Sequence, residues 1–121
     1  MRKFVFFLFL VFSMGSCTSQ EQIKTIAPKD LKVLLAKKNV QILDVRTPEE
    51  IAQGTLKNAK FANYFDVNFT ENASTKLNKS KPVYILCRSG NRSLKACKIL
   101  KEKGFDVINI SGGINQWKKE N

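Results

Sequence analysis

The chain has 121 residues and a mass of 13.7 kDa, a length that excludes more than one compact domain. It contains no histidine, which excludes a cysteine–histidine dyad and makes a zinc site implausible. Its formal net charge of +11 at pH 7 favours acidic surfaces or anionic small molecules as partners. Nucleic acid is disfavoured, because the lysines are scattered rather than clustered.

The first sixteen residues have the three-part pattern of a signal peptide. Arg2 and Lys3 precede an unbroken apolar run over 4–12, and small residues follow at 15–16. The run is well below the roughly 20 residues that a membrane-spanning helix needs, so we expect export without a permanent span. Without Arg2 and Lys3 the net charge is still +9, so the exported protein remains strongly basic.

Cys17 directly follows Met14, Gly15 and Ser16, and this run resembles the lipobox of bacterial lipoproteins. The resemblance implies cleavage before Cys17, diacylation of its thiol and acylation of the new amine. Acyl chains contribute about 0.8 kcal/mol per buried methylene and would anchor the protein on the periplasmic side of a bacterial membrane. An ordinary cleaved signal peptide with a free Cys17 is the alternative. The chain then divides into a signal peptide at 1–16, a linker at 17–22 and a folded domain at 23–121.

Short apolar runs alternate with amphipathic segments through this domain. We expect strands at 23–26, 40–45, 61–62, 82–86 and 107–110. We expect helices from Pro28, from Pro48 behind a Thr47 cap, at 93–103 and after the glycines at 112–113. The polar segment 66–77 is ambiguous between a loop and a short helix. This alternation predicts an α/β fold with a mostly parallel sheet of about five strands and helices on both faces.

The residues best suited to take part in a reaction lie where the strand at 82–86 ends. Cys87 comes directly after that strand, and Arg88-Ser89-Gly90-Asn91-Arg92 leads from it into a helix. Ligands of open α/β sheets bind at the carboxyl ends of strands, where loop N–H groups and a helix N-terminus form an anion cradle. In that field we expect the Cys87 thiol to exist largely as a nucleophilic thiolate. A buried structural cysteine is the alternative, but it needs no arginine-rich loop.

Cys97 is expected to be a core residue. It shares one helix face with Leu94 and Leu100, and its Cα is expected to lie beyond the ~7 Å limit for a disulfide with Cys87. A resolving thiol that reacts with oxidised Cys87 is the alternative.

Three motifs, in the same order along the chain, resemble those of the rhodanese family. The run from Cys87 to Ser93 looks like the family's active-site loop, and Gly112-Gly113 with Trp117 resembles its closing motif. Leu43-Asp44-Val45-Arg46, with Glu50 and Gly54, resembles its first signature. The resemblance covers about 23–118. Thr55 and Asn63-Tyr64 depart from the pattern, which has His and Ile-Pro there in many relatives, and they affect local loop shape more than activity.

The resemblance implies a rhodanese-like sulfurtransferase that needs no cofactor or metal. Cys87 would take the outer sulfur of an anionic donor such as thiosulfate, hold it as a persulfide and pass it to a thiol or cyanide-like acceptor. The amides of 88–92 would hold the persulfide, while the side chains of Arg88 and Arg92 would attract the donor. We expect a monomer.

The first signature is expected to support this loop rather than to react. Asp44 is expected near the loop, and Arg46 and Glu50 are expected to form a structural ion pair. Trp117 is expected to belong to the core.

Two other functions compete with sulfur transfer. Phosphatases and arsenate reductases of related fold have five residues between Cys and Arg, whereas four separate Cys87 from Arg92, so the smaller loop suits a persulfide better than phosphate. A non-catalytic binding or sulfur-sensing module is the second alternative. The presence of Cys87 disfavours it, because such modules usually lack the nucleophile.

Overall fold

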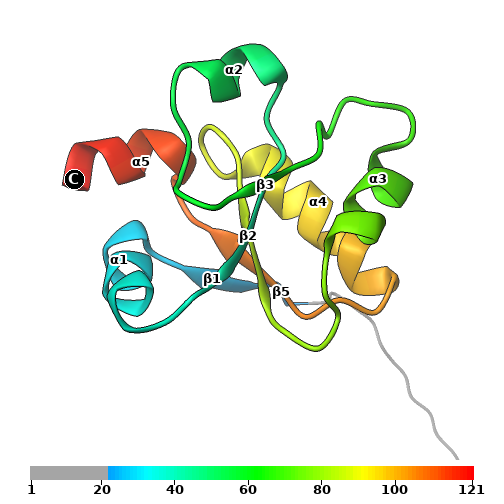
Figure 1. Cartoon of the computed structure of the whole chain (residues 1–121), viewed down its shortest axis with the longest axis horizontal. Coiled ribbons are helices and arrows are strands. Elements are labelled where there is room, and N and C mark those ends of the chain that lie inside the picture. Colours follow the sequence, from blue (N-terminus) through cyan, green and yellow to red (C-terminus); the bar gives the residue numbers. More distant parts are fainter. Residues whose placement is uncertain (1–21) are drawn as a thin grey trace, which may run out of the picture.

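The computed structural model describes residues 22–121, so the predicted signal peptide, Cys17 and most of the linker lie outside the described residues. Within this range one five-stranded sheet has the order β1-β5-β4-β2-β3, and every neighbouring pair is parallel (Figure 1). The strands are β1 (Lys24–Ile26), β2 (Gln41–Asp44), β3 (Lys60–Phe61), β4 (Val83–Leu86) and β5 (Val107–Ile110). The helices are α1 (Pro28–Lys37), α2 (Pro48–Ala52), α3 (Phe69–Lys76), α4 (Asn91–Glu102) and α5 (Gly113–Glu120). The predicted α/β class is confirmed, and the sheet is parallel throughout.

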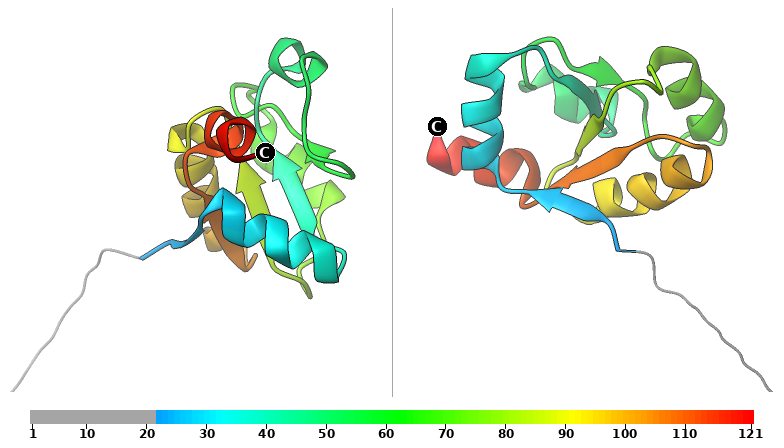
Figure 2. Two further views of the ribbon diagram at one scale, coloured as in Figure 1. Left: turned by 90° about the vertical axis from the view of Figure 1, so that its left-hand side faces the viewer. Right: turned by 90° about the horizontal axis from the view of Figure 1, so that it is seen from below.

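Helices cover both faces of the sheet, as Figure 2 shows. Successive strand residues point to opposite faces: Leu43 belongs to the cluster under α3 and α4, while its neighbour Ile42 belongs to the cluster under α1 and α5. Full burial of such side chains contributes about 1.5–3 kcal/mol each. The two clusters therefore hold the sheet rigid from both sides and fix where its carboxyl edge lies.

Local sequence explains where the helices begin and end. Thr47 caps α2 through a reciprocal pair of bonds: its Oγ1 accepts from the Glu50 N–H at 3.3 Å, and Glu50 Oε1 accepts from the Thr47 N–H at 3.0 Å. Helix α4 begins at Asn91, two residues before the predicted start, because Gly90 adopts a left-handed conformation (φ 103°) and serves as its N-cap. The ambiguous segment 66–77 contains α3, which buries Phe69 and Ala73 against the core.

The short strand β3 forms one edge of the sheet. Its two residues pair with β2, Asp44 lying opposite Phe61, and the chain then leaves the carboxyl edge of the sheet toward α3 (Figure 1). Strand β4 lies between β5 and β2, so the loop that follows it emerges near the middle of the same edge. Among the described residues, no helix is long and apolar enough to cross a membrane.

Candidate active site

Cys87 lies directly after β4, with its sulfur turned toward its own loop. Only 1% of the residue is exposed, and the Gly90 N–H donates a hydrogen bond to the sulfur at 3.0 Å. The left-handed backbone of Gly90 bends the loop back over the sulfur and aims this N–H inward. The sulfur therefore sits beneath a closely wrapped loop, and any reaction partner must reach it with a slender group.

The residues of the loop differ in how far they are exposed. Arg88, Ser89 and Asn91 are exposed, and Arg92 is half-buried in the first turn of α4. The positive end of the α4 backbone faces the loop, an arrangement that favours negative charge there.

Helix α5 supports this loop through its backbone. The N–H groups at the start of α5 donate to the loop carbonyls, Ile114 to Cys87 at 2.9 Å and Asn115 to Arg88 at 3.1 Å. A side chain on Gly113 would overlap the Cys87 carbonyl and the Arg88 backbone, so only glycine permits this approach. The closing motif thus acts by packing its backbone against the loop that carries Cys87.

Two buried polar residues also contact the loop: Ser93, which ended the predicted active-site run but had no assigned role, and Asn109, which was not predicted. Ser93 Oγ lies 3.2 Å from the Cys87 sulfur and donates to Asn109 Oδ1 at 2.5 Å, while Asn109 Nδ2 donates to the Gly90 carbonyl at 3.4 Å. Either the Ser93 hydroxyl or the Cys87 thiol can be the donor in the contact between them. The sequence did contain one signal for this network: Asn109 is a polar residue at an inward position of an otherwise apolar strand.

Glu50 pairs with Arg92, and the predicted Arg46–Glu50 ion pair is wrong. The Arg92 guanidinium donates two bonds to the Glu50 carboxylate, at 2.7 and 2.8 Å. These bonds lower the pKa of Glu50 to about 2, the partial burial of the carboxylate acting in the opposite direction, and Glu50 in turn raises the pKa of Arg92. Arg46 reaches only the backbone carbonyl of Glu50, at 3.3 Å. The pair links α2 to the first turn after the Cys87 loop.

Arg46 instead forms a buried ion pair with Asp44. Arg46 Nη2 donates to Asp44 Oδ2 at 2.8 Å and Nε donates to Oδ1 at 3.0 Å, a two-bond geometry that the planar guanidinium favours over a reach to Glu50. The hydroxyl of Thr55 donates to the same carboxylate at 2.7 Å, and the Gly54 carbonyl accepts from Arg46 at 2.8 Å. Asp44 pairs in register with Leu86, next to Cys87, but its carboxylate is fully engaged in holding the α2 segment.

Cys97 lies in the core, as predicted, and both described cysteines are free. Burial raises the pKa of Cys97 to about 12, with a smaller contribution from nearby Cys87. A thiol with this pKa stays protonated at neutral pH and is a poor resolving nucleophile. Trp117 is half-buried against the cluster under α1 and α5, which agrees with its predicted core role.

A parallel α/β sheet carries a cysteine at the carboxyl end of an inner strand, in a loop whose Gly90 N–H faces its sulfur, and this arrangement defines a class of α/β proteins with a loop-bound cysteine. The family model of the rhodanese-like domain matches residues 27–120. The chain belongs to the rhodanese family.

Relatives and solved structures agree with this family. A "Sulfurtransferase" of Allochromatium vinosum is 38% identical over 80 residues, covering 65% of this chain and 72% of that protein. "Thiosulfate sulfurtransferase 18" of Arabidopsis thaliana is 32% identical over 117 residues, covering 87% of this chain and 85% of that protein. The crystal structure of a rhodanese-like domain protein from Staphylococcus aureus superposes with a TM-score of 0.71 at 38% identity, covering 78% of this chain and 91% of that one. The fold and the family are therefore established by sequence and structure together.

Proposed function

We propose that this protein is a rhodanese-type sulfurtransferase in which Cys87 is the nucleophile. It takes a sulfane sulfur from an anionic donor such as thiosulfate and delivers it to a thiol or to a cyanide-like acceptor. The observation that carries this proposal is the Gly90 N–H aimed at the Cys87 sulfur at 3.0 Å, in a loop at the positive end of α4. A structural core cysteine would need no inward-facing amide.

The reaction has two displacement steps. The Cys87 thiolate attacks the outer sulfur of thiosulfate, the S–S bond of the donor breaks, and sulfite leaves with the bonding electron pair. The amides of residues 88–92 then stabilise the anionic persulfide. In the second step the acceptor attacks the outer sulfur of the persulfide and Cys87 leaves as the thiolate. No external oxidant or reductant is consumed.

The two loop arginines have different roles in this mechanism. Arg92 is neutralised by its two bonds to Glu50, so its main effect is to position the first turn of α4. Arg88 is exposed beside Cys87, and its charge attracts the anionic donor toward the loop.

The decisive experiment is intact mass measurement after incubation with thiosulfate. The wild-type protein should gain one sulfur (~32 Da), and this gain should reverse on addition of cyanide. Cys87→Ala should gain nothing, while the matched control Cys97→Ala, which removes the other described thiol, should still gain one sulfur. Loading of Cys87→Ala would refute the assignment of the nucleophile.

We also propose that the protein acts outside the cytoplasm as a lipid-anchored monomer, with Cys17 as the acylated residue and 23–121 as the folded domain. This proposal is supported by the sequence of residues 1–17. Cells fed a clickable fatty acid should label the wild-type protein and not Cys17→Ser. Equal labelling of the two would refute the anchor.

A further inference from the structure

Exposed apolar side chains gather on one segment of the described chain. Four large hydrophobic residues of the described chain are strongly exposed, and three of them lie at the end of β3 or in the connection from β3 to α3: Phe61 (40%), Phe65 (65%) and Val67 (fully exposed). The fourth, Val33 on α1, is 56% exposed and stands alone. Scattered apolar residues are ordinary on a protein surface, whereas a cluster of them is typical of an interaction site.

This segment is linked to the loop that holds Cys87. The guanidinium of Arg92 lies over the Phe65 ring, 5.3 Å from its centre, and Arg92 is in the first turn after that loop. The ring also packs edge-on against Tyr64, which holds it in place. A molecule that covers Phe65 therefore lies one side chain away from the loop around the sulfur.

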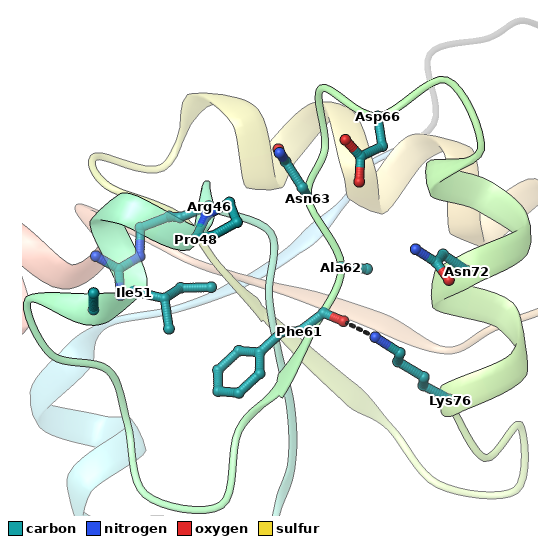
Figure 3. Close-up of a pocket in the computed structure, with 10 residues that line it drawn as sticks. Arg46, Pro48, Ile51, Phe61, Ala62, Asn63, Asp66, Asn72 and Lys76 are labelled. Atoms are coloured by element: carbon teal, nitrogen blue, oxygen red, sulfur yellow. Dashed lines mark hydrogen bonds between the residues drawn. The ribbon is translucent and has the colours of Figure 1, made fainter.

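A hollow opens beside the same segment, between α2 and α3 (Figure 3). Its volume is about 360 Å³, and Pro48, Ile51 and Phe61 provide much of its apolar wall. This is near the lower end of the range for small-ligand pockets, about 300–1,000 Å³, and suits one large apolar side chain. The hollow includes no residue of the 87–92 loop, so it is separate from the proposed reaction site.

The charge around the hollow favours an acidic occupant. The ammonium group of Lys76 lies at the edge of the hollow and donates to the Phe61 carbonyl, while Asp66 is the carboxylate among the lining residues (Figure 3). Lys60, which does not line the hollow, donates to the Lys76 carbonyl. The whole chain carries a net charge of +11. A partner with apolar anchors and surrounding carboxylates would match this surface.

We infer that the acceptor of the sulfur is a cysteine on an acidic, apolar segment of another protein, and that this segment docks on Phe61, Phe65, Val67 and the adjoining hollow. The inference rests on the proposed function. Cys87 is only 1% exposed, which suits a single cysteine side chain as the entering group, and neither cyanide nor thiosulfate is large enough to use the apolar cluster. The partner thiolate attacks the outer sulfur of the Cys87 persulfide, the S–S bond breaks, Cys87 leaves as the thiolate, and the partner carries the new persulfide.

The test compares three blocked acceptor peptides with the full-length protein loaded from thiosulfate. They are Glu-Leu-Cys-Glu-Phe-Glu, the acidic polar Glu-Ser-Cys-Glu-Ser-Glu and the neutral polar Gln-Ser-Cys-Gln-Ser-Gln. We expect kcat/KM to fall in that order for the wild type. The double variant Phe65→Ser, Val67→Ser should lose roughly tenfold for the first peptide only, the size expected when two anchor side chains are removed. Its rate with cyanide should not change.

Val67→Ser and Val33→Ser form a matched pair, since each removes one exposed valine and only Val67 belongs to the proposed surface. Val67→Ser should weaken transfer to the apolar peptide, and Val33→Ser should leave it intact. Equal rates for the three peptides, or equal losses in these two variants, would overturn the inference while sulfur transfer to cyanide still supported the proposed function.

Binding is measured separately from transfer, with a fluorescent copy of the apolar peptide in which serine replaces its cysteine. Anisotropy should show binding to the wild type that the Phe65→Ser, Val67→Ser variant weakens roughly tenfold. This result would support the docking surface even if no sulfur were transferred to cyanide. A failure of transfer to cyanide would count against the proposed function, not against the docking surface. Unchanged binding in the double variant would refute the proposed docking surface.

Discussion

Arg92 and Glu50 are 42 residues apart in the sequence and form a two-bond ion pair that ties α2 to the first turn of α4. The pair connects the family's first signature with the Cys87 loop. The contact is made by side chains alone, because α2 and α4 are not joined by strand pairing. Its removal should therefore affect stability and loop geometry together.

The first prediction concerns the pH dependence of this pair. The pKa of Glu50 is about 2 in the folded protein and 4.5 in its ordinary state, so the carboxylate stabilises the fold above pH 4.5 and this contribution is lost as the pH falls from about 4.5 to 2. Solvent screening of a partly exposed pair reduces the effect to about 1 kcal/mol. Glu50→Gln keeps a capping side chain at this position but loses the charge.

Urea denaturation of the wild type and Glu50→Gln at pH 7 and pH 2.5 measures this contribution. The difference in unfolding free energy should be present at pH 7 and much smaller at pH 2.5. A difference that is equal at both pH values would show that the charge of Glu50 does not stabilise the fold.

The second prediction concerns the hydroxyl beside the sulfur. Ser93 Oγ contacts both the Cys87 sulfur and Asn109 Oδ1, so its loss leaves the Asn109 carbonyl without that buried donor. Ser93→Ala should cost about 1–3 kcal/mol in stability and slow sulfur loading from thiosulfate. Ser93→Thr, which keeps the hydroxyl, should recover most of the loading rate in a time course followed by intact mass. Equal rates in the two variants would show that the hydroxyl does not act on the sulfur.

The third prediction separates structural from reactive roles in the first signature. Asp44→Ala leaves the buried guanidinium of Arg46 without its partner and should cost about 3–5 kcal/mol. Thr55→Val removes one hydrogen bond to the same carboxylate and should cost about 1 kcal/mol. Thermal and urea unfolding give both values. If Asp44→Ala were as stable as the wild type and merely inactive, Asp44 would have a direct part in the reaction.

The fourth prediction uses two glycines with left-handed backbones. Gly113→Ala places a methyl group against the Cys87 carbonyl and should reduce the sulfur-loading rate by more than tenfold through displacement of the loop. Gly54→Ala meets no atom within 4 Å, so it should show only the backbone strain, about 1 kcal/mol. The loading rates of the two variants are measured at a temperature where both are folded. They distinguish the effect of a methyl group that overlaps the Cys87 carbonyl from the effect of backbone strain at a positive φ. Similar losses in both would contradict the role assigned to Gly113.

Much of the fold could be predicted because its determinants are local. The apolar runs gave all five strands to within two residues, and Thr47 with Pro48 gave the start of α2. The start of α4 was missed because a left-handed glycine can serve as a cap without a capping side chain, and the sequence does not reveal the backbone conformation of Gly90. Segment 66–77 was ambiguous because α3 buries only two apolar residues.

The site was predictable where it lies on consecutive residues and unpredictable where it depends on side-chain pairing in space. The Cys87 loop is contiguous, so its position at the end of β4 followed from the sequence. The partner of Glu50 did not, because only the fold brings Arg92 next to Glu50, while Arg46 turns back to Asp44. Asn109 was missed for the same reason, since it acts from a different strand.

The reactive loop is supported by a helix that is synthesised after it. The carbonyls of Cys87 and Arg88 are held by N–H groups of Ile114 and Asn115, which belong to the closing helix. A nascent or truncated polypeptide that ends before Gly113 would carry the cysteine and its arginines but not the backbone clamp beneath them. Assembly of the sulfur site is thus coupled to the docking of α5, and the loop around the thiol is held on both sides only after this helix has packed against it.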